Sequence, residues 1–258
     1  MWLDWSSRAP DGRGFGVVDL TERGELSSQV KDHVGELLRD ARFRPEVLER
    51  QAARLGWNRM RTRLKPPDDE RGKRGEWGES LFYGISEEFD GYELPVKKLR
   101  YKLALKQSLP GTDIIAFRLN TDLDIAEVAL IECKLRCTAD LRAGIGAYRQ
   151  LLEDYQEGFA DILAFVDEVT SMSDSTFSEA FRRYLVNRDD VSGIETYHLA
   201  LAFDTSIWDE RILGLLDGEQ LELDPLRVCA LRIERLAQVI EETYAHMGIR
   251  RVSGEDDD

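Results

Sequence analysis

Hydrophobic and polar positions along this chain follow two different periods, which predicts a mixture of helices and strands. In some stretches apolar residues recur every three or four positions, as on one face of a helix. These stretches are 25–40, a segment opening at 45, 75–89, 140–155, about 159–169, 177–186, 207–216 and 224–247. Elsewhere apolar residues alternate or form short runs, which is typical of strands. These strands are expected at 11–20, 94–105, 112–119, 126–135 and 196–203.

The order of these elements predicts an α/β fold in which a mixed central sheet is flanked by helices. Several predicted strands are apolar on both faces, which suits a sheet that is covered by helices on both sides. We expect residues 1–70 to form an N-terminal, mainly helical extension whose second helix is basic. Residues 71–250 would form the main domain, and 251–258 a disordered acidic tail.

Charge is distributed unevenly, although the net charge of the chain is −15. Residues 1–150 hold 26 Lys and Arg against 25 Asp and Glu, whereas residues 151–258 hold 9 against 25. Basic clusters bind phosphate backbones whatever the total charge, and solvated faces are the alternative reading. The acidic half suits a protein-docking surface better than a nucleic-acid surface. The candidates for nucleic-acid contact are Lys97, Lys98, Arg100 and Lys102.

The cysteines and the hydropathy of the chain point to a cytoplasmic protein. Cys133, Cys137 and Cys229 form no CxxC pair, so reduced thiols are expected. No apolar run approaches the roughly 18 residues that span a membrane. The N-terminal residues also lack the basic and apolar regions of a secretory signal.

The candidate chemistry lies in two strands joined by a polar turn. Glu132 precedes Lys134 by two positions, and among the eight lysines of the chain only Lys134 has an acid at that spacing. Residues two apart on a strand leave the same face, so Cys133 leaves the other. The hairpin places Asp113 opposite Ile131 or Glu132, although a register error of one residue would reverse the facing.

Carboxylates placed in this way suit a divalent cation. Asp113 and Glu132 supply the hard oxygen ligands that Mg²⁺ or Mn²⁺ prefers, and Glu79 on the preceding predicted helix would complete the shell. Phosphodiester hydrolysis is the commonest chemistry of such a site. Lys134 would orient the attacking water or stabilise charge on phosphorus. The alternative is a salt bridge at the end of a strand, although burying Glu132 and Lys134 costs several kcal/mol unless they are paired or metal-bound.

These residues resemble the PD-(D/E)xK nuclease superfamily, with its restriction-endonuclease-like core. Asp113 occupies the position of the first Asp, Glu132 and Lys134 those of the ExK motif, and Glu79 that of the helix acid. Thr112 stands where a proline is often found. Segments 74–79 and 94–102, with the EcK strand, look more narrowly like the nuclease subunit (HamA type) of Hachiman anti-phage defence systems. That resemblance implies a Mg²⁺-dependent DNA nuclease that acts with, or is restrained by, a superfamily 2 helicase.

Two other functions compete with this interpretation. One is a non-catalytic nucleic-acid-binding or regulatory subunit that keeps the nuclease fold. The other is a small-molecule enzyme on an α/β core, but the chain has no glycine-rich phosphate loop and no GxSxG motif. Its histidines occur singly in predicted elements, where we expect structural or surface roles: His33, His198 and His246.

Overall fold

The computed structural model describes most of the chain, in seven segments. These segments are residues 3–8, 14–22, 27–56, 66–101, 111–171, 175–187 and 193–249. All structural statements below concern these residues.

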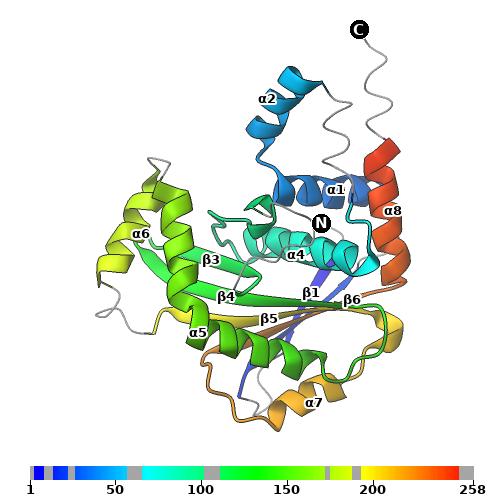
Figure 1. Ribbon diagram of the computed structural model, residues 1–258. Helices are drawn as coiled ribbons and strands as arrows, with labels where there is room; N and C mark the ends of the chain where they lie inside the picture. The colour runs from blue at the N-terminus through cyan, green and yellow to red at the C-terminus, as the bar shows by residue number, and fades with distance from the viewer. Residues whose placement is uncertain are drawn as a thin grey trace.

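A six-stranded mixed sheet forms the centre of the molecule (Figure 1). Its order is β1-β2-β6-β5-β4-β3. The inner pairs β2–β6, β6–β5 and β5–β4 are parallel, and the outer pairs β1–β2 and β4–β3 are antiparallel. The predicted α/β fold with a mixed sheet is therefore confirmed. The strands are β1 (Leu3–Arg8), β2 (Gly16–Glu22), β3 (Ile114–Leu119), β4 (Ile125–Arg136), β5 (Glu195–Asp204) and β6 (Leu226–Ile233).

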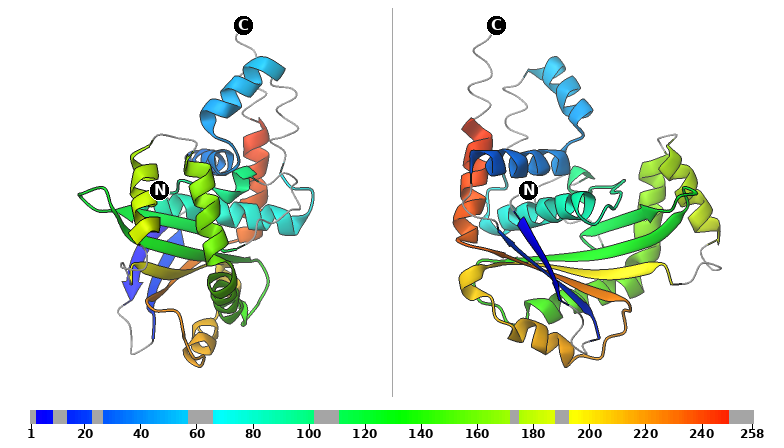
Figure 2. Two further views of the ribbon diagram at one scale, coloured as in Figure 1. Left: turned by 60° about the vertical axis from the view of Figure 1, so that its left-hand side comes forward. Right: turned by 180° about the vertical axis from the view of Figure 1, so that it is seen from behind.

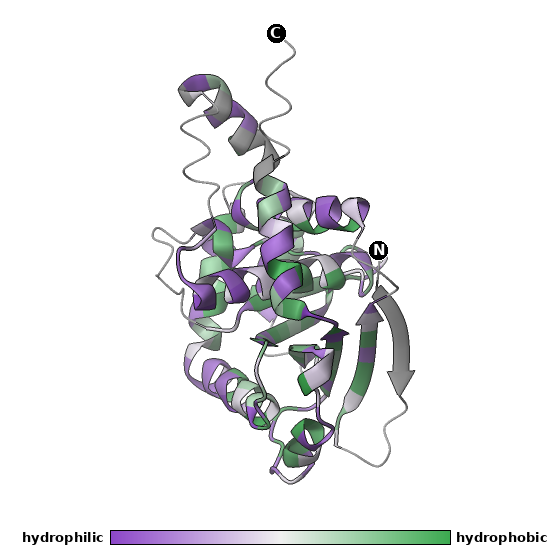
Figure 3. Cartoon of the chain, turned by 90° about the vertical axis from the view of Figure 1, so that its right-hand side faces the viewer, coloured by the Kyte–Doolittle hydropathy of each residue, from purple (hydrophilic) through white to green (hydrophobic). Residues whose placement is uncertain are grey.

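Helices cover both faces of the sheet, as the strands that are apolar on both sides require (Figures 1 and 2). One face packs on α1 (Ser28–Arg42), α4 (Glu70–Glu88) and α8 (Leu236–Ile249). The other packs on α5 (Ala143–Ser171), α6 (Thr176–Asn187) and α7 (Arg211–Asp217). Apolar residues are concentrated on the strands, and hydrophilic residues recur along the helices (Figure 3). The remaining helices are α2 (Pro45–Leu55) and the 3₁₀ turns η1 (Lys98–Tyr101) and η2 (Thr205–Ile207).

Helix α4 carries Glu79 and begins earlier than the predicted start at residue 75. The side chain of Asp69 caps it by accepting a hydrogen bond of 2.7 Å from the backbone N–H of Gly72. Trp77, Leu81 and Tyr83 are fully buried along the helix. Burial at successive positions fixes α4 against the sheet, and hence the direction in which Glu79 leaves it.

The N-terminal part of the chain joins the central sheet. β2 pairs in parallel with β6, and β1 pairs with β2 at the edge of the sheet. Helix α1 packs against α4 and α8. The extension predicted for residues 1–70 therefore contributes two strands and one core helix to the fold.

The single helix predicted over 224–247 is wrong in its first half. Residues 226–233 form β6, and the helix begins only at Leu236. Leu226, Val228 and Ala230 are buried in alternation, and β5 and β2 supply the backbone hydrogen bonds on either side. Tertiary pairing decides here, because the same apolar residues fit a helical stripe almost as well.

The strand predicted over 94–105 is also wrong within the described residues. Glu93 forms an isolated bridge with Phe117, and residues 98–101 then form η1. Pro95 has no N–H to donate to a ladder, so the strand cannot continue through it. Residues 102–110, including Lys102, lie outside the described part of the chain.

A buried ion pair ties the helices of one face together. Arg42 on α1 lies 3.5 Å from Glu76 on α4, and the hydroxyl of Tyr244 on α8 donates to the same carboxylate over 3.4 Å. Glu76→Ala would leave the Arg42 guanidinium buried without this carboxylate. We expect a loss of about 3 kcal/mol in the free energy of unfolding, measured by chemical denaturation. Glu36→Ala, an exposed site on α1, is the control, and equal losses would contradict this prediction.

Candidate functional site

The hairpin of β3 and β4 sets the geometry of the site. Ile114 pairs with Ile131, and one further step in that register brings Asp113 level with Glu132. The Oδ2 atom of Asp113 accepts a hydrogen bond of 2.9 Å from the backbone N–H of Cys133. The predicted pairing is confirmed, and Asp113 is held against β4 at the position where Glu132 leaves the strand.

Glu132 and Lys134 point toward the α5 face of the sheet. Val128 and Leu130 belong to the core beneath α5. Glu132 and Lys134 follow Leu130 by two and four positions on β4, so their side chains leave on the same face. Ile131 packs in the core beneath α4, and Cys133 packs against it. The prediction that Cys133 leaves the opposite face is therefore confirmed.

Glu132 is a buried acid in contact with a partly exposed lysine. It is 3% exposed, and its Oε1 accepts a hydrogen bond from Nζ of Lys134, whose side chain is 25% exposed. Burial raises the pKa of Glu132 to about 8, and the charge of Asp113 adds to this rise while Lys134 opposes it. A nearby cation would relieve this unfavourable burial of charge.

Glu79 approaches the same region from α4. Burial raises the pKa of both Tyr83 and Cys133, and the charges of Glu79 and Asp113 raise it further. Among the described residues, however, no three His, Cys, Asp or Glu side chains are arranged so that they could hold a metal ion. Asp113 and Glu79 therefore act on the same neighbours without completing a metal shell in this conformation.

Lys98 lies among these acids and was predicted only as a phosphate contact. It is buried, and its Nζ donates hydrogen bonds of 2.9 Å to the carbonyl oxygen of Gly111 and 2.8 Å to that of Thr112. Burial lowers the pKa of Lys98, while four carboxylates act in the opposite direction. Those four are Asp113, Glu79, Asp154 and Glu132.

Asp154 on α5 is an acid of the site that the sequence analysis missed. Burial and the charge of Asp113 raise its pKa, against the hydrogen bond from Gln150 and the charge of Lys98. That hydrogen bond, from Nε2 of Gln150 to Oδ1 of Asp154, is 3.1 Å long. Asp154 lies three residues after the buried Leu151, at the border of the apolar face of the helix. An acid at the border of an apolar helix face is a weak signal by itself, because the sequence pattern does not specify how α5 packs on the sheet.

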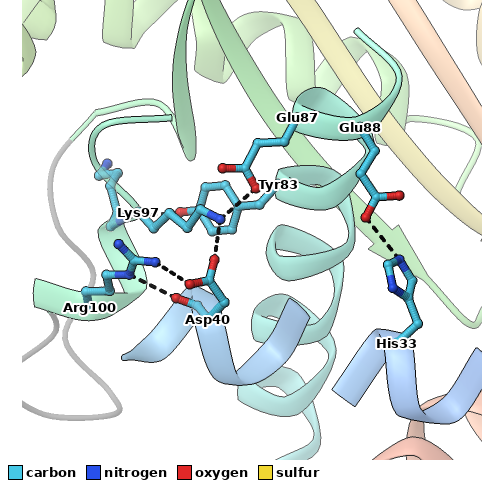
Figure 4. Close-up of polar contacts among 8 residues, drawn as sticks. His33, Asp40, Tyr83, Glu87, Glu88, Lys97 and Arg100 are labelled. Carbon is cyan, nitrogen blue, oxygen red and sulfur yellow. Dashed lines mark hydrogen bonds and ion pairs between the residues drawn. The ribbon is translucent and has the colours of Figure 1, made fainter. Parts of the chain in front are cut away.

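The other basic residues proposed for nucleic-acid contact have partners inside the protein (Figure 4). Lys97 is 4% exposed, and its Nζ donates to Asp40 over 2.5 Å and to Glu87 over 2.7 Å. Arg100 donates to both the backbone and the carboxylate of Asp40. With Lys98 bound to carbonyls, three of the four proposed residues have internal partners, which weakens the hypothesis that they contact phosphate. Asp40 on α1 and Glu87 on α4 therefore neutralise part of the charge of this basic segment.

The histidines make structural contacts. His198 is buried beside the ring of Tyr92, and burial lowers its pKa to about 3, so it stays neutral. His33 contacts Glu88 at 3.1 Å, and His246 contacts Asp32 at 2.8 Å. None of these contacts includes an acid of the candidate site, which gives no support to the small-molecule enzyme.

The donors of the site are of the chemical type that a hard divalent cation takes, although among the described residues no three of them are arranged as a metal shell. Asp113 and Glu132 present carboxylate oxygens on one face of the sheet, and Asp154 and Glu79 are the further acids within electrostatic reach of Lys98. Oxygen ligands of this kind suit Mg²⁺ or Mn²⁺. The raised pKa of Glu132 shows that negative charge is disfavoured where Glu132 lies, and a cation would reverse that.

Fold and site together define an α/β protein with carboxylates and a lysine at the ends of two paired strands. A family model, described as HamA, matches residues 10–244, and the chain belongs to that family. The predicted HamA-type relationship is thus confirmed, and it fits a component of a Hachiman defence system. No curated protein matches the chain. Within the described residues, no helix is both long enough and apolar enough to cross a membrane.

Proposed function

We propose that this chain is the metal-dependent DNA nuclease subunit of a Hachiman anti-phage defence system, hydrolysing phosphodiester bonds together with a helicase partner. The observation that carries the proposal is the shared face of Asp113, Glu132 and Lys134 at the paired ends of β3 and β4. The resemblance to the PD-(D/E)xK superfamily supports the same reaction. Family membership supports the defence context.

Each residue has a role that follows from its position. Asp113 and Glu132 would hold Mg²⁺ or Mn²⁺, and Glu79 and Asp154 are the further acids whose charge acts on Lys98 beside them. When bound, the cation would lower the pKa of a ligated water and offset phosphate charge. The N–H of Cys133 orients the carboxylate of Asp113. Lys134 is partly exposed beside Glu132, so its ammonium can meet the substrate, either at the attacking water or at the charged phosphoryl oxygens.

The direct test is the cleavage of supercoiled plasmid, alone and with the helicase partner. We expect nicking with Mg²⁺ and none with EDTA. Single-stranded DNA and RNA of matched sequence, run beside the plasmid, identify the preferred polymer. Absence of metal-dependent cleavage of every polymer, in both the free and the partnered state, would contradict the proposal.

Asp154 gives a further prediction for the same assay. Asp154→Asn keeps the shape of the side chain and the contact with Gln150 but removes a charge near Asp113 and Lys98. We expect the Mg²⁺ concentration for half-maximal cleavage to rise about tenfold, as for groups that support metal ligands. Glu153→Gln, at the adjacent exposed position, is the matched control. Equal metal requirements in the two variants would exclude Asp154 from the site.

One observation favours a second function, a non-catalytic nucleic-acid-binding or regulatory subunit. Among the described residues no three acids are arranged to hold a metal, and Glu132 is already paired with Lys134. Such a subunit would bind nucleic acid with a steep salt dependence and without metal-dependent cleavage. The plasmid assay and a salt titration of binding therefore separate the two functions.

A further inference from the structure

The segment that delivers Asp113 is fixed by contacts from three directions. From η1, Nζ of Lys98 donates to the carbonyl oxygens of Gly111 and Thr112, the two residues immediately before Asp113. From β4, the carbonyl oxygen of Ile131 accepts a hydrogen bond of 2.8 Å from Oγ1 of Thr112. These contacts hold both sides of the turn into β3.

Helix α5 closes the third side. Gly111 has a φ of +84°, a conformation that favours glycine, and a Cβ atom there would lie 2.6 Å from the side chain of Ile162. The turn is therefore packed directly against α5, the helix that also carries Asp154. Any shift of Gly111 toward α5 is blocked, so the carbonyls stay within reach of Lys98.

Lys98 also connects this turn to α4. Its backbone N–H donates a hydrogen bond of 3.0 Å to the hydroxyl of Tyr83, a fully buried residue. Tyr83 lies four residues after Glu79, on the same side of the helix. A single residue thus joins the strand end that holds Asp113 to the helix that holds Glu79.

We infer that Lys98 is a positioning residue that fixes the Gly111–Asp113 turn and so places the carboxylate of Asp113 opposite Glu132. The inference rests on the proposed function, because it assigns Lys98 to the same site. Two acids facing each other repel, and a mobile turn would let Asp113 move away from Glu132. The hydrogen bonds of Lys98 to two carbonyls prevent that movement, and its positive charge offsets the repulsion. Lys98 therefore supports the site through the turn before Asp113.

Two substitutions in adjacent residues test this role. Lys98→Met keeps the length and apolar stem of the side chain and removes the donors to Gly111 and Thr112. Lys97→Met is the matched control, because Lys97 is also buried but pairs with Asp40 and Glu87 instead. We expect the half-saturating Mg²⁺ concentration for cleavage to rise at least about tenfold in Lys98→Met and to stay at the wild-type value in Lys97→Met.

Hydrogen–deuterium exchange supplies a readout that does not depend on activity. We expect faster exchange in a peptide covering residues 111–116 in Lys98→Met than in either the wild type or Lys97→Met. Thr112→Val removes only the hydrogen bond to Ile131 and should shift both readouts in the same direction by less. This variant remains informative if Lys98→Met does not fold.

The outcomes separate this inference from the proposed function. Absence of metal-dependent cleavage by the wild-type protein would contradict the proposed function. The exchange measurement would still test whether Lys98 holds the Gly111–Asp113 turn. Wild-type metal dependence that is unchanged in Lys98→Met and Thr112→Val overturns the positioning role alone. Exchange at 111–116 that is equal in Lys98→Met and Lys97→Met overturns the role of Lys98 in holding the turn.

Discussion

Glu132→Gln and Lys134→Met are each expected to lower Mg²⁺-dependent cleavage by roughly a thousandfold. Glutamine keeps the size of Glu132 but removes the anionic oxygen that would bind the cation. Methionine keeps the stem of Lys134 and removes the ammonium that would meet the substrate phosphate. Single-turnover cleavage at saturating Mg²⁺ measures the chemical step directly.

A third variant on the same strand serves as the control. Glu127 lies near the opposite end of β4, where it accepts hydrogen bonds from Tyr92 and Thr196. Glu127→Gln should cleave at close to the wild-type rate. Because both strand-end variants change a buried pair, their melting temperatures should be measured first. Folded Glu132→Gln and Lys134→Met proteins that cleave at the wild-type rate would remove the enzyme assignment.

The second large effect is the dependence of metal binding on pH. A cation held by Glu132 would bind the ionised form of this carboxyl, whose pKa is raised to about 8 by burial and by the charge of Asp113. Below that pH the proton competes with the metal, so the half-saturating Mg²⁺ concentration should rise about tenfold per pH unit. Cleavage measured against Mg²⁺ concentration between pH 6 and pH 9 tests this slope. A half-saturating concentration that does not change with pH would contradict the assignment of Glu132 as a ligand.

The same carboxyl makes stability depend on pH when no metal is present. Glu132 has an ordinary pKa of 4.5 in the unfolded chain and a pKa of about 8 in the folded protein. Between these values the folded state holds one more proton, so this contribution to stability is complete below about pH 4.5 and is lost as pH rises toward 8. Melting temperature in EDTA should therefore fall more over this window in the wild type than in Glu132→Gln. Equal changes in melting temperature with pH for the two proteins would contradict the raised pKa of Glu132.

The hairpin could be predicted from the sequence because two independent signals agree on its register. The polar turn marks the centre, and strand alternation then sets which residues share a face. Ile114 pairs with Ile131 as those signals require, and Glu132 and Lys134 leave on the α5 face. A short-range connection makes such a prediction dependable, since few residues separate the paired strands.

The errors in the fold come from segments whose form is decided by distant partners. β6 lies between β5 and β2, and β2 belongs to the first twenty-two residues of the chain. The local sequence of residues 226–233 does not indicate that this segment will pair between β5 and β2. The conformation of the segment after Pro95 is likewise set by distant partners. Lys97 bonds to α1 and α4, and Lys98 bonds to the turn before β3.

The site could be predicted in part for the same reason. Asp113, Glu132 and Lys134 lie on one hairpin, so spacing along the strands identifies them. Asp154 comes from α5, and Lys98 reaches the turn before Asp113 from η1. Their places depend on how helices pack on the sheet, which the sequence pattern does not specify.

The proposal that Asp113 and Glu132 bind one divalent cation is best tested by diffraction from crystals soaked in Mn²⁺, because manganese gives an anomalous signal that locates the ion. We expect one peak between the carboxylates of Asp113 and Glu132, and we expect it to disappear in Glu132→Gln crystals. Wild-type crystals at saturating Mn²⁺ with no peak between these two carboxylates would contradict the account.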